Sequence, residues 1–228
     1  MQASIIIRVK NERENLIKLF EILKKQTYQD FEILLVDNES TDGSEKIAFD
    51  YFSSDRIQVI KIKDFSYSKA CNLGAQTARG KYLIYLSAHS FPISKTWLAD
   101  GLVHFQDEQV AGVSAYPHPG KEGTMWERLF FEPPHLLLKL GLRSFNLGNT
   151  NSIIRKSFWE KHHFNESLIR SEDLEWSMYW KNKGFKIVSE PKFSVYHSHR
   201  LDPLGILRAE IGWKRENLKI RNSLDTKF

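Results

Sequence analysis

The fold is decided by the stretch Ile33-Leu34-Leu35-Val36-Asp37-Asn38-Glu39-Ser40-Thr41-Asp42-Gly43-Ser44. Its four leading apolar residues are typical of a fully buried parallel strand, which stops abruptly at polar residues. Ligands of an open α/β sheet bind at the carboxyl ends of its strands, so Asp37 stands at the favoured place. Its carboxylate can accept a hydrogen bond from the N–H edge of a nucleotide base. Residues 40–44 are expected to form a turn and the N-cap of a helix, and an ordinary strand-to-helix turn has the same pattern.

Three further segments repeat this arrangement. Residues 4–9, 57–62 and 81–86 are apolar and rich in β-branched or aromatic residues, and each of the first two is followed by apolar residues at helical spacing. Strands that alternate with helices indicate βαβ units. We therefore predict an α/β protein with a single doubly wound, mostly parallel sheet flanked by helices, whose strand ends converge on one nucleotide-sized crevice.

Length and composition agree with one such core. The chain has 228 residues, of which 41% are hydrophobic, enough for a single large α/β domain. The single cysteine, Cys71, excludes an internal disulfide framework. Residues 1–3 run directly into the first strand, without the features of a secretory signal, and no run approaches the ~20 apolar residues of a membrane span. We expect a cytoplasmic protein, with the inner face of the membrane as a further location.

Positive charge gathers near the C-terminus of a chain whose net charge is +5. Residues 201–228 are predicted to form a basic amphipathic helix, suited to peripheral membrane contact or to packing back on the domain. Nucleic acid is not an expected partner, because no helix-turn-helix, zinc finger or ribonucleoprotein motif accompanies the charge. The basic and apolar residues that alternate here are Leu204, Ile206, Leu207, Arg208, Ile211, Trp213, Lys214, Arg215, Leu218, Lys219, Ile220 and Arg221.

Residues 125–145 interrupt the α/β rhythm with a dense apolar patch that lacks strand periodicity. An exposed patch of this kind would suit a dimer interface, and burial against the sheet is the alternative. Residues 145–152 then lead into a short strand at Ile153-Ile154.

Six short motifs occur in a specific order along the chain, and together they resemble the inverting family 2 glycosyltransferases of the A-type glycosyltransferase fold. The likeness runs from Ser4 to about Arg200, and a Leu86-Ser87 strand end with a late Tyr196–His199 motif is similar to the rhamnosyltransferase-like branch. It implies a catalytic domain over 1–200, with a donor half over about 1–115 and an acceptor half over about 116–200. The six motifs are Asn11-Glu12, Val36–Ser44, Lys69–Gly74, Gly80-Lys81-Tyr82, Phe164-Asn165-Glu166 and Ser171–Trp176.

The resemblance implies roles for individual residues. Asp173 is expected to be the general base that takes the proton of the attacking sugar hydroxyl, with Glu172 beside it. Ser171 as an N-cap and acids favoured by the helix dipole would also explain this segment. The implied substrate-binding residues are Arg8, Val9, Asn11, Glu12, Asp37, Glu39, Lys69, Asn72, Ser87, Ala88, Gly148, Asn149, Trp176 and Arg200.

The fourth strand ends in Ser87-Ala88-His89, where the family usually has Asp-x-Asp, whose last carboxylate binds a divalent cation. Imidazole can replace that carboxylate, as in the polypeptide N-acetylgalactosaminyltransferases, and it suits Mn²⁺ better than Mg²⁺. In those relatives a late histidine lies three residues before an arginine on the diphosphate. His197 and Arg200 have that spacing, and His199 is the spare candidate. Histidines that bind no ligand are the alternative.

The function implied by the resemblance is that of an inverting hexosyltransferase in bacterial surface-polysaccharide assembly. Its donor would be a nucleoside-diphosphate sugar, with UDP or dTDP favoured over GDP, and its acceptor a glycan or a lipid-linked glycan. Two other classes stay open. A sugar nucleotidyltransferase normally has a glycine-rich phosphate loop, which residues 8–12 lack. A catalytically degenerate nucleotide-sugar-binding protein would explain Ser87.

Overall fold

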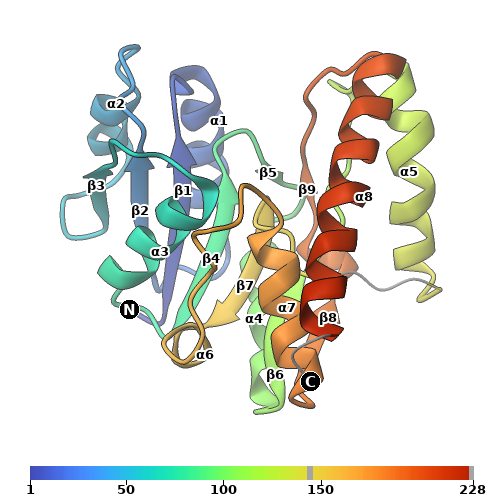
Figure 1. The fold of residues 1–228 in the computed structure, drawn as a ribbon. Coiled ribbons are helices and arrows are strands. Elements are labelled where there is room, and N and C mark those ends of the chain that lie inside the picture. The colour runs from blue at the N-terminus through green and yellow to red at the C-terminus, as the bar shows by residue number, and fades with distance from the viewer. Residues whose placement is uncertain (143–145, 226–228) are drawn as a thin grey trace.

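Strands and helices alternate along the chain, as the sequence predicts. The computed structural model describes residues 1–142 and 146–225 (Figure 1). The elements are β1 (Ala3–Val9), α1 (Arg13–Lys24), β2 (Phe31–Asp37), α2 (Ser44–Tyr51), β3 (Ile57–Lys61), α3 (Tyr67–Thr77), β4 (Tyr82–Ser87), β5 (Phe91–Pro92), α4 (Trp97–Leu102), the 3₁₀ helix η1 (Val103–Gln106), β6 (Val110–Ser114), α5 (Met125–Lys139), β7 (Asn151–Arg155), α6 (Lys156–Trp159), α7 (Glu172–Asn182), β8 (Lys186–Ser189), the 3₁₀ helix η2 (Pro191–Phe193), β9 (Val195–Tyr196) and α8 (Pro203–Asp225).

The main sheet confirms the predicted α/β class. Its seven strands have the order β3-β2-β1-β4-β7-β6-β8, and a second, two-stranded sheet pairs β5 with β9. Strands β1 to β4 pair in parallel, and so do β6 and β8. Strand β7 runs antiparallel to both of its neighbours. The sheet is therefore mostly parallel, with the one reversed strand β7 between β4 and β6.

Two apolar layers cover the sheet. Because side chains alternate along a strand, Ile5 and Ile7 face one layer and Ile6 faces the other. The first layer packs against α1, α2 and α4, and the second against α3, α6 and α7. The central strands are buried on both faces, which explains why their sequences are almost continuously apolar.

Several of the predicted site residues lie where the parallel strands end. In the strand register, Val9 is level with Asp37, and Arg8 is level with Ser87. The ends of β1, β2 and β4 thus meet at one edge of the sheet, with β1 in the middle. The residues that follow these three strands are brought together there.

Two helix starts differ from the sequence prediction. Gly43, with φ of 87°, precedes α2, and Ser171, with φ of 65°, precedes α7; neither residue caps its helix with a side chain. Nearby carboxylates accept the free N–H groups in place of the expected hydroxyls. Asp42 accepts from the Ser44 N–H at 2.9 Å, and Asp173 accepts from the Leu174 N–H at 2.8 Å.

The two longest helices, α5 and α8, stand together at the edge of the molecule farthest from α1 and α2 (Figure 1). The apolar segment 125–145 forms α5 through Lys139, and the predicted C-terminal helix is α8. Phe145, residues 226–228 and the side chains of Lys219 and Arg221 lie outside the described residues. Within the described part of the chain, none of the helices has the length and apolar character that crossing a membrane requires.

Candidate active site

Asp37 ends β2 with its carboxylate fully buried. One oxygen, Oδ2, accepts hydrogen bonds from the Lys61 ammonium at 2.8 Å and the Ser40 N–H at 3.2 Å. The Lys61 ammonium also pairs with Glu45. The second oxygen, Oδ1, has no hydrogen-bond partner among the residues that the structure describes. A buried carboxylate oxygen without a partner is costly, and this atom can still accept a hydrogen bond.

The loop after β1 ties the edge of the sheet together. Asn11 has a φ of 54°; its N–H donates to Ser40 Oγ at 2.8 Å, and its side-chain oxygen accepts from the Thr41 N–H at 2.8 Å. The next residue, Glu12, donates its N–H to Ser44 Oγ at 3.0 Å. Glu39, exposed and with a φ of 53°, belongs to the same β2–α2 loop. The loops after β1 and β2 are thus held as one unit beside Asp37.

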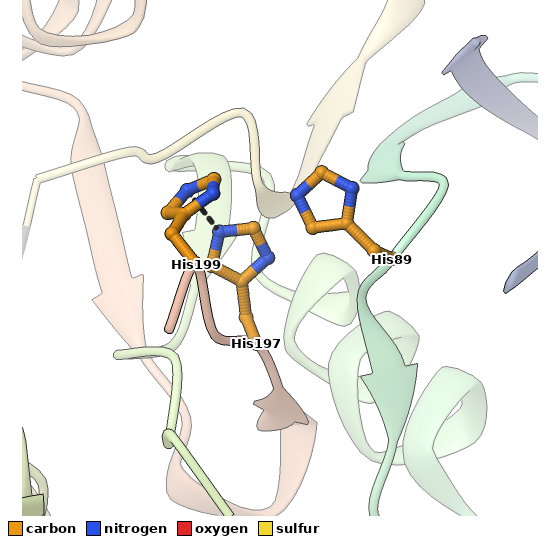
Figure 2. A group of neighbouring side chains, drawn as sticks. All are labelled: His89, His197 and His199. Atoms are coloured by element: carbon orange, nitrogen blue, oxygen red, sulfur yellow. Dashed lines mark hydrogen bonds between the residues drawn. The ribbon is translucent and has the colours of Figure 1, made fainter. Parts of the chain in front are cut away.

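Three histidines from distant parts of the chain converge beyond the end of β4 (Figure 2). One ring nitrogen from each of His89, His197 and His199 can be chosen so that all three atoms lie within 4.8 Å of one another. The His89 and His197 rings are stacked with centroids 4.7 Å apart, and the Nε2 atoms of His197 and His199 are 3.0 Å apart. Strand β9 ends at Tyr196, before either late histidine, and the loop that follows brings both rings to the same point.

The far side of two of these rings is fixed by hydrogen bonds. His89 donates Nδ1–H to the Glu12 carboxylate at 2.8 Å, and His197 Nδ1 hydrogen-bonds to the Ser90 hydroxyl at 3.0 Å. Each ring is then free to direct Nε2 toward the cluster, which is how metal-binding histidines are oriented by a carboxylate or hydroxyl behind them. The donor set therefore fits a divalent cation that accepts imidazole ligands.

The protonation of the cluster also suits a cation. Burial and then the neighbouring imidazoles lower the pKa of His197 well below its ordinary value. Burial lowers the pKa of His199 in the same direction. Burial alone would raise the pKa of Glu12, but hydrogen bonds from His89 and Asn15 lower it, so this carboxylate stays ionised. Neutral imidazoles backed by a carboxylate are the form in which histidine binds metals.

Asp173, in the first turn of α7, is half-buried and held by backbone donors. Its Oδ2 accepts the Asn149 N–H at 2.8 Å, while its Oδ1 accepts the Leu174 N–H. Asn149 also donates its side-chain amide to Glu172 at 3.2 Å, and its carbonyl accepts from the Arg8 guanidinium at 2.8 Å. Glu172, 4% exposed, lies 3.9 Å from Arg8, so these four residues form one buried polar cluster.

The charge state of Asp173 follows from this setting. Burial and then the adjacent Glu172 carboxylate raise the pKa of Asp173 to about 7, against the hydrogen bonds from Asn149 and Leu174. A carboxyl that titrates near neutral pH is suited to accept a proton during a reaction. Arg8 connects this cluster with the histidines, because its positive charge also lowers the pKa of His197. Burial and the other two imidazoles contribute more to that lowering.

The remaining predicted residues fall into two groups, those at the sheet edge and those apart from it. Val9 and Ala88 are buried strand-end residues, and Ser87 Oγ lies 3.4 Å from His89 Nε2. Lys69 and Asn72 line a separate hollow of about 670 Å³. The Asn72 amide is fully engaged there, since it donates to the Phe164 carbonyl and Glu166 and accepts from Trp159 and the Phe164 N–H.

The position of Trp176 contradicts the prediction that this residue binds substrate. It is 0% exposed inside the second apolar layer, and its indole N–H donates to the His162 carbonyl at 2.7 Å. It therefore lies on the side of α7 that packs against the sheet. An aromatic residue at helical spacing from Trp180 is typical of a core position, and that signal was present in the sequence.

Two cavities share His197 and His199 as part of their walls. A polar one of about 660 Å³ is lined by Glu12, Lys121 and Arg200, among others. An apolar one of about 270 Å³ is lined by Tyr116, Phe131, Leu147, Gly148 and Trp213. Among the described residues, a Cβ at Gly148 would meet nothing within 4 Å.

Sequence reasoning missed Ser90, Phe131 and Trp213. Ser90 lies 107 positions from the histidine it contacts, and the two aromatic residues reach the apolar cavity from α5 and α8. None of these three contacts has a local sequence signal.

The comparisons with known proteins agree with this architecture. The family model described as "Glycosyl transferase family 2" matches residues 4–165, so the chain belongs to glycosyl transferase family 2. It is 26% identical over 196 residues to the O-antigen chain rhamnosyltransferase WbaN of Salmonella anatum, covering 81% of this chain and 62% of that protein. It is 28% identical over 213 residues to the glycosyltransferase AglE of Haloferax volcanii, covering 90% and 68%.

Solved structures are similar in fold. The mannosyltransferase PcManGT of Pyrobaculum calidifontis, in complex with GDP-Man and Mn²⁺, superposes with a TM-score of 0.71 at 15% identity, covering 90% of this chain and 58% of that one. S. aureus TarS 1–349 in complex with UDP gives a TM-score of 0.64 at 20% identity, covering 90% and 62%. The chain thus spans about three fifths of the length of WbaN and of these two structures, and it has the A-type glycosyltransferase fold.

Proposed function

We propose that this chain transfers a sugar from a nucleoside-diphosphate sugar to an acceptor hydroxyl with inversion at the anomeric carbon. The observation that carries the proposal is the unpaired, buried Oδ1 of Asp37 at the same sheet edge as the histidine cluster. Glu12 links the two, because its N–H donates to Ser44 in the β2–α2 loop and its carboxylate accepts from His89. Family membership supports the same reaction class.

Asp37 is assigned to the nucleotide base. Uracil and thymine each present one ring N–H beside carbonyl oxygens, so Oδ1 can accept that N–H as its missing hydrogen bond. We therefore favour UDP or dTDP over GDP. Of the similar structures, TarS has been solved with UDP and PcManGT with GDP-Man.

The donor diphosphate is assigned to the histidine cluster. His89, His197 and His199 would hold a divalent cation, Mn²⁺ by preference, and that cation would neutralise the diphosphate as its bond to the sugar breaks. Arg200 lines the polar cavity on the same cluster, where its guanidinium suits a diphosphate. Ser87 leaves this site without the carboxylate that the family usually has, so imidazole carries the metal binding.

Asp173 is assigned as the general base, with Glu172 and Arg8 holding its surroundings. In a single displacement, the acceptor hydroxyl gives its proton to Asp173 while its oxygen bonds to the anomeric carbon. The bond from that carbon to the diphosphate oxygen breaks at the same time, so the configuration inverts and the nucleoside diphosphate leaves. The Asn149 and Leu174 N–H groups fix the carboxylate, and the pKa of about 7 keeps it basic enough to take the proton.

The acceptor is assigned to the apolar cavity lined by Phe131, Leu147 and Trp213. An apolar wall beside a sugar-transfer site suits a lipid-linked glycan, as used in bacterial surface-polysaccharide assembly. The relationship to WbaN, an O-antigen chain rhamnosyltransferase, supports this setting.

The test is a donor screen with UDP-, dTDP- and GDP-sugars, with Mn²⁺ or with chelator. We expect release of UDP or dTDP in Mn²⁺, and we expect the anomeric configuration of the transferred sugar to be inverted by NMR. Tight nucleotide binding without any turnover would instead identify a degenerate binding protein, the class that Ser87 favours. Pyrophosphate release from a nucleoside triphosphate and a sugar phosphate would identify a nucleotidyltransferase.

A further inference from the structure

Helix α5 carries its apolar residues on the outside. Its inner side is formed by Glu127, His135 and Leu138, which are all buried. Its outer side carries five large apolar residues, between 39% and 63% exposed: Trp126, Leu129, Phe130, Leu136 and Leu137. A helix turns about 100° per residue, so these five lie within an arc of about 120°, opposite the buried side. Within the described part of the chain, this helix therefore presents an exposed apolar surface.

Helix α8 presents a second surface with a different pattern. Four apolar residues, between 43% and 61% exposed, lie in a narrow arc along its outer side: Leu204, Leu207, Ile211 and Leu218. At the same turn per residue, Lys214 falls on one flank of this arc, and Arg208 and Arg215 fall on the other. All three cations are exposed. An apolar row between two basic flanks is typical of a helix that lies in a membrane interface.

The two helices are neighbours and both border the apolar cavity beside the histidines. They stand side by side in Figure 1, and the Thr124 hydroxyl at the start of α5 donates to the Leu201 carbonyl before α8 at 2.8 Å. Phe131 of α5 and Trp213 of α8 line the cavity together with His197 and His199. A ligand bound to the helix pair is therefore next to the site of chemistry.

We propose that the outer faces of α5 and α8 bind an anionic lipid bilayer, with the helices in the plane of its surface. The apolar rows would enter the boundary of the acyl chains, and Arg208, Lys214 and Arg215 would contact the anionic headgroups. Charge complementarity favours lipid over a second copy of the chain, because pairing the α8 faces of two copies would bring cations toward cations. The bilayer contact does not depend on the proposed transferase activity; its link to a lipid-linked acceptor does.

The experiment is co-sedimentation of the 228-residue chain with vesicles of phosphatidylglycerol mixed with phosphatidylcholine, and with vesicles of phosphatidylcholine alone. We expect binding to the anionic vesicles to be about tenfold tighter or more, and to weaken as salt is added. Equal binding to both vesicles, or to neither, would overturn the proposal.

Two surface variants locate the contact. Arg208→Gln/Lys214→Gln/Arg215→Gln should lower binding to anionic vesicles to about the level seen with phosphatidylcholine. Leu207→Ser/Ile211→Ser/Leu218→Ser should remove binding to both. The control is Lys24→Gln/Lys25→Gln/Lys46→Gln, which makes the same charge change at exposed positions in and beside α1 and α2 and should bind like the parent.

Two further readouts distinguish lipid binding from self-association and from damage to the nucleotide site. UDP binding should be unchanged in every surface variant. The two proposals can therefore fail separately: loss of vesicle binding would not affect the proposed transferase function, and absence of transferase activity would not affect vesicle binding. Light scattering gives the oligomeric state. A dimer that the apolar variant converts to monomer, with vesicle binding absent, would show that these faces bind a second copy instead.

Discussion

The chain has two sets of apolar side chains, and they differ in where they are directed. In β1, β2 and β4 the buried apolar residues are at most 3% exposed. On α5 and α8, apolar residues of similar size, such as Leu129 and Leu204, are more than half exposed. The first set stabilises the fold, because burial removes its surface from water. The second set contributes little to the stability of this chain and is available for binding, so the comparison separates residues that hold the fold from residues that serve contacts.

The largest expected effect tests the buried set. Trp176→Ala should lower the free energy of unfolding by about 3–5 kcal/mol, because it removes a fully buried indole and leaves a cavity. Leu218→Ala on α8 should change it by no more than about 0.5 kcal/mol, since that side chain is 60% exposed. Urea denaturation of both variants measures the difference. Normal stability of Trp176→Ala with lost nucleotide affinity would restore Trp176 to the substrate site.

The next effect concerns Asp173, whose substitution should change the rate of transfer but not the binding of UDP. Asp173→Asn should lower the rate of transfer by about 10²-fold or more, because the amide cannot take the acceptor proton. The variant should bind UDP like the parent, since Asp173 is assigned to the acceptor side. Single-turnover transfer assays with matched folding checks measure this. Transfer at half the parental rate would remove Asp173 from the role of base.

A smaller effect is expected at the nucleotide end of the site. Asp37→Asn should weaken UDP binding by about tenfold, because the amide at this position no longer offers a charged acceptor to the base. Lys61→Met is the matched control, since it removes the present partner of Asp37 but not the acceptor itself. Calorimetric titration compares the two variants. Equal affinity of Asp37→Asn and the parent for UDP, dTDP and GDP would place the base elsewhere.

A further effect is a pH dependence of stability. Because the pKa of Asp173 is raised in the folded state, its stabilising contribution is complete below the unfolded pKa of about 4 and is lost as the pH rises through about 7. Asp173→Asn has no such proton to lose. As the pH rises between these two values, the unfolding free energy of the parent should therefore fall relative to that of this variant, as measured by urea denaturation. A constant difference across this range would show that the carboxyl has an ordinary pKa.

The parallel half of the fold could be predicted because each of its signals is local. A continuous apolar run followed by polar turn residues marks both the strand and its end, and the βαβ rule then places the ends together. Asp37 was located in this way. The reversed strand β7 was not predicted as such, because two isoleucines specify a strand but not its direction.

The rest of the site depends on contacts between distant segments. The sequence indicated three histidines, but the partners Glu12 and Ser90 that orient them come from loops 77 and 107 residues away. Similarly, the dense apolar residues of 125–139 could not indicate which side of the helix faces outward. The packing of Glu127 and His135 against the domain determines that α5 turns its larger apolar side away from it.

Calorimetric titration of UDP at neutral pH tests most directly whether imidazoles hold a cation for the donor diphosphate at this sheet edge. In the parent, we predict affinity about tenfold higher or more in Mn²⁺ than in chelator. In His197→Ala, we predict that the affinity in Mn²⁺ falls to the value in chelator. Equal affinity of the parent in Mn²⁺ and in chelator would contradict the claim, and would assign the diphosphate to Arg200 and neighbouring cations alone.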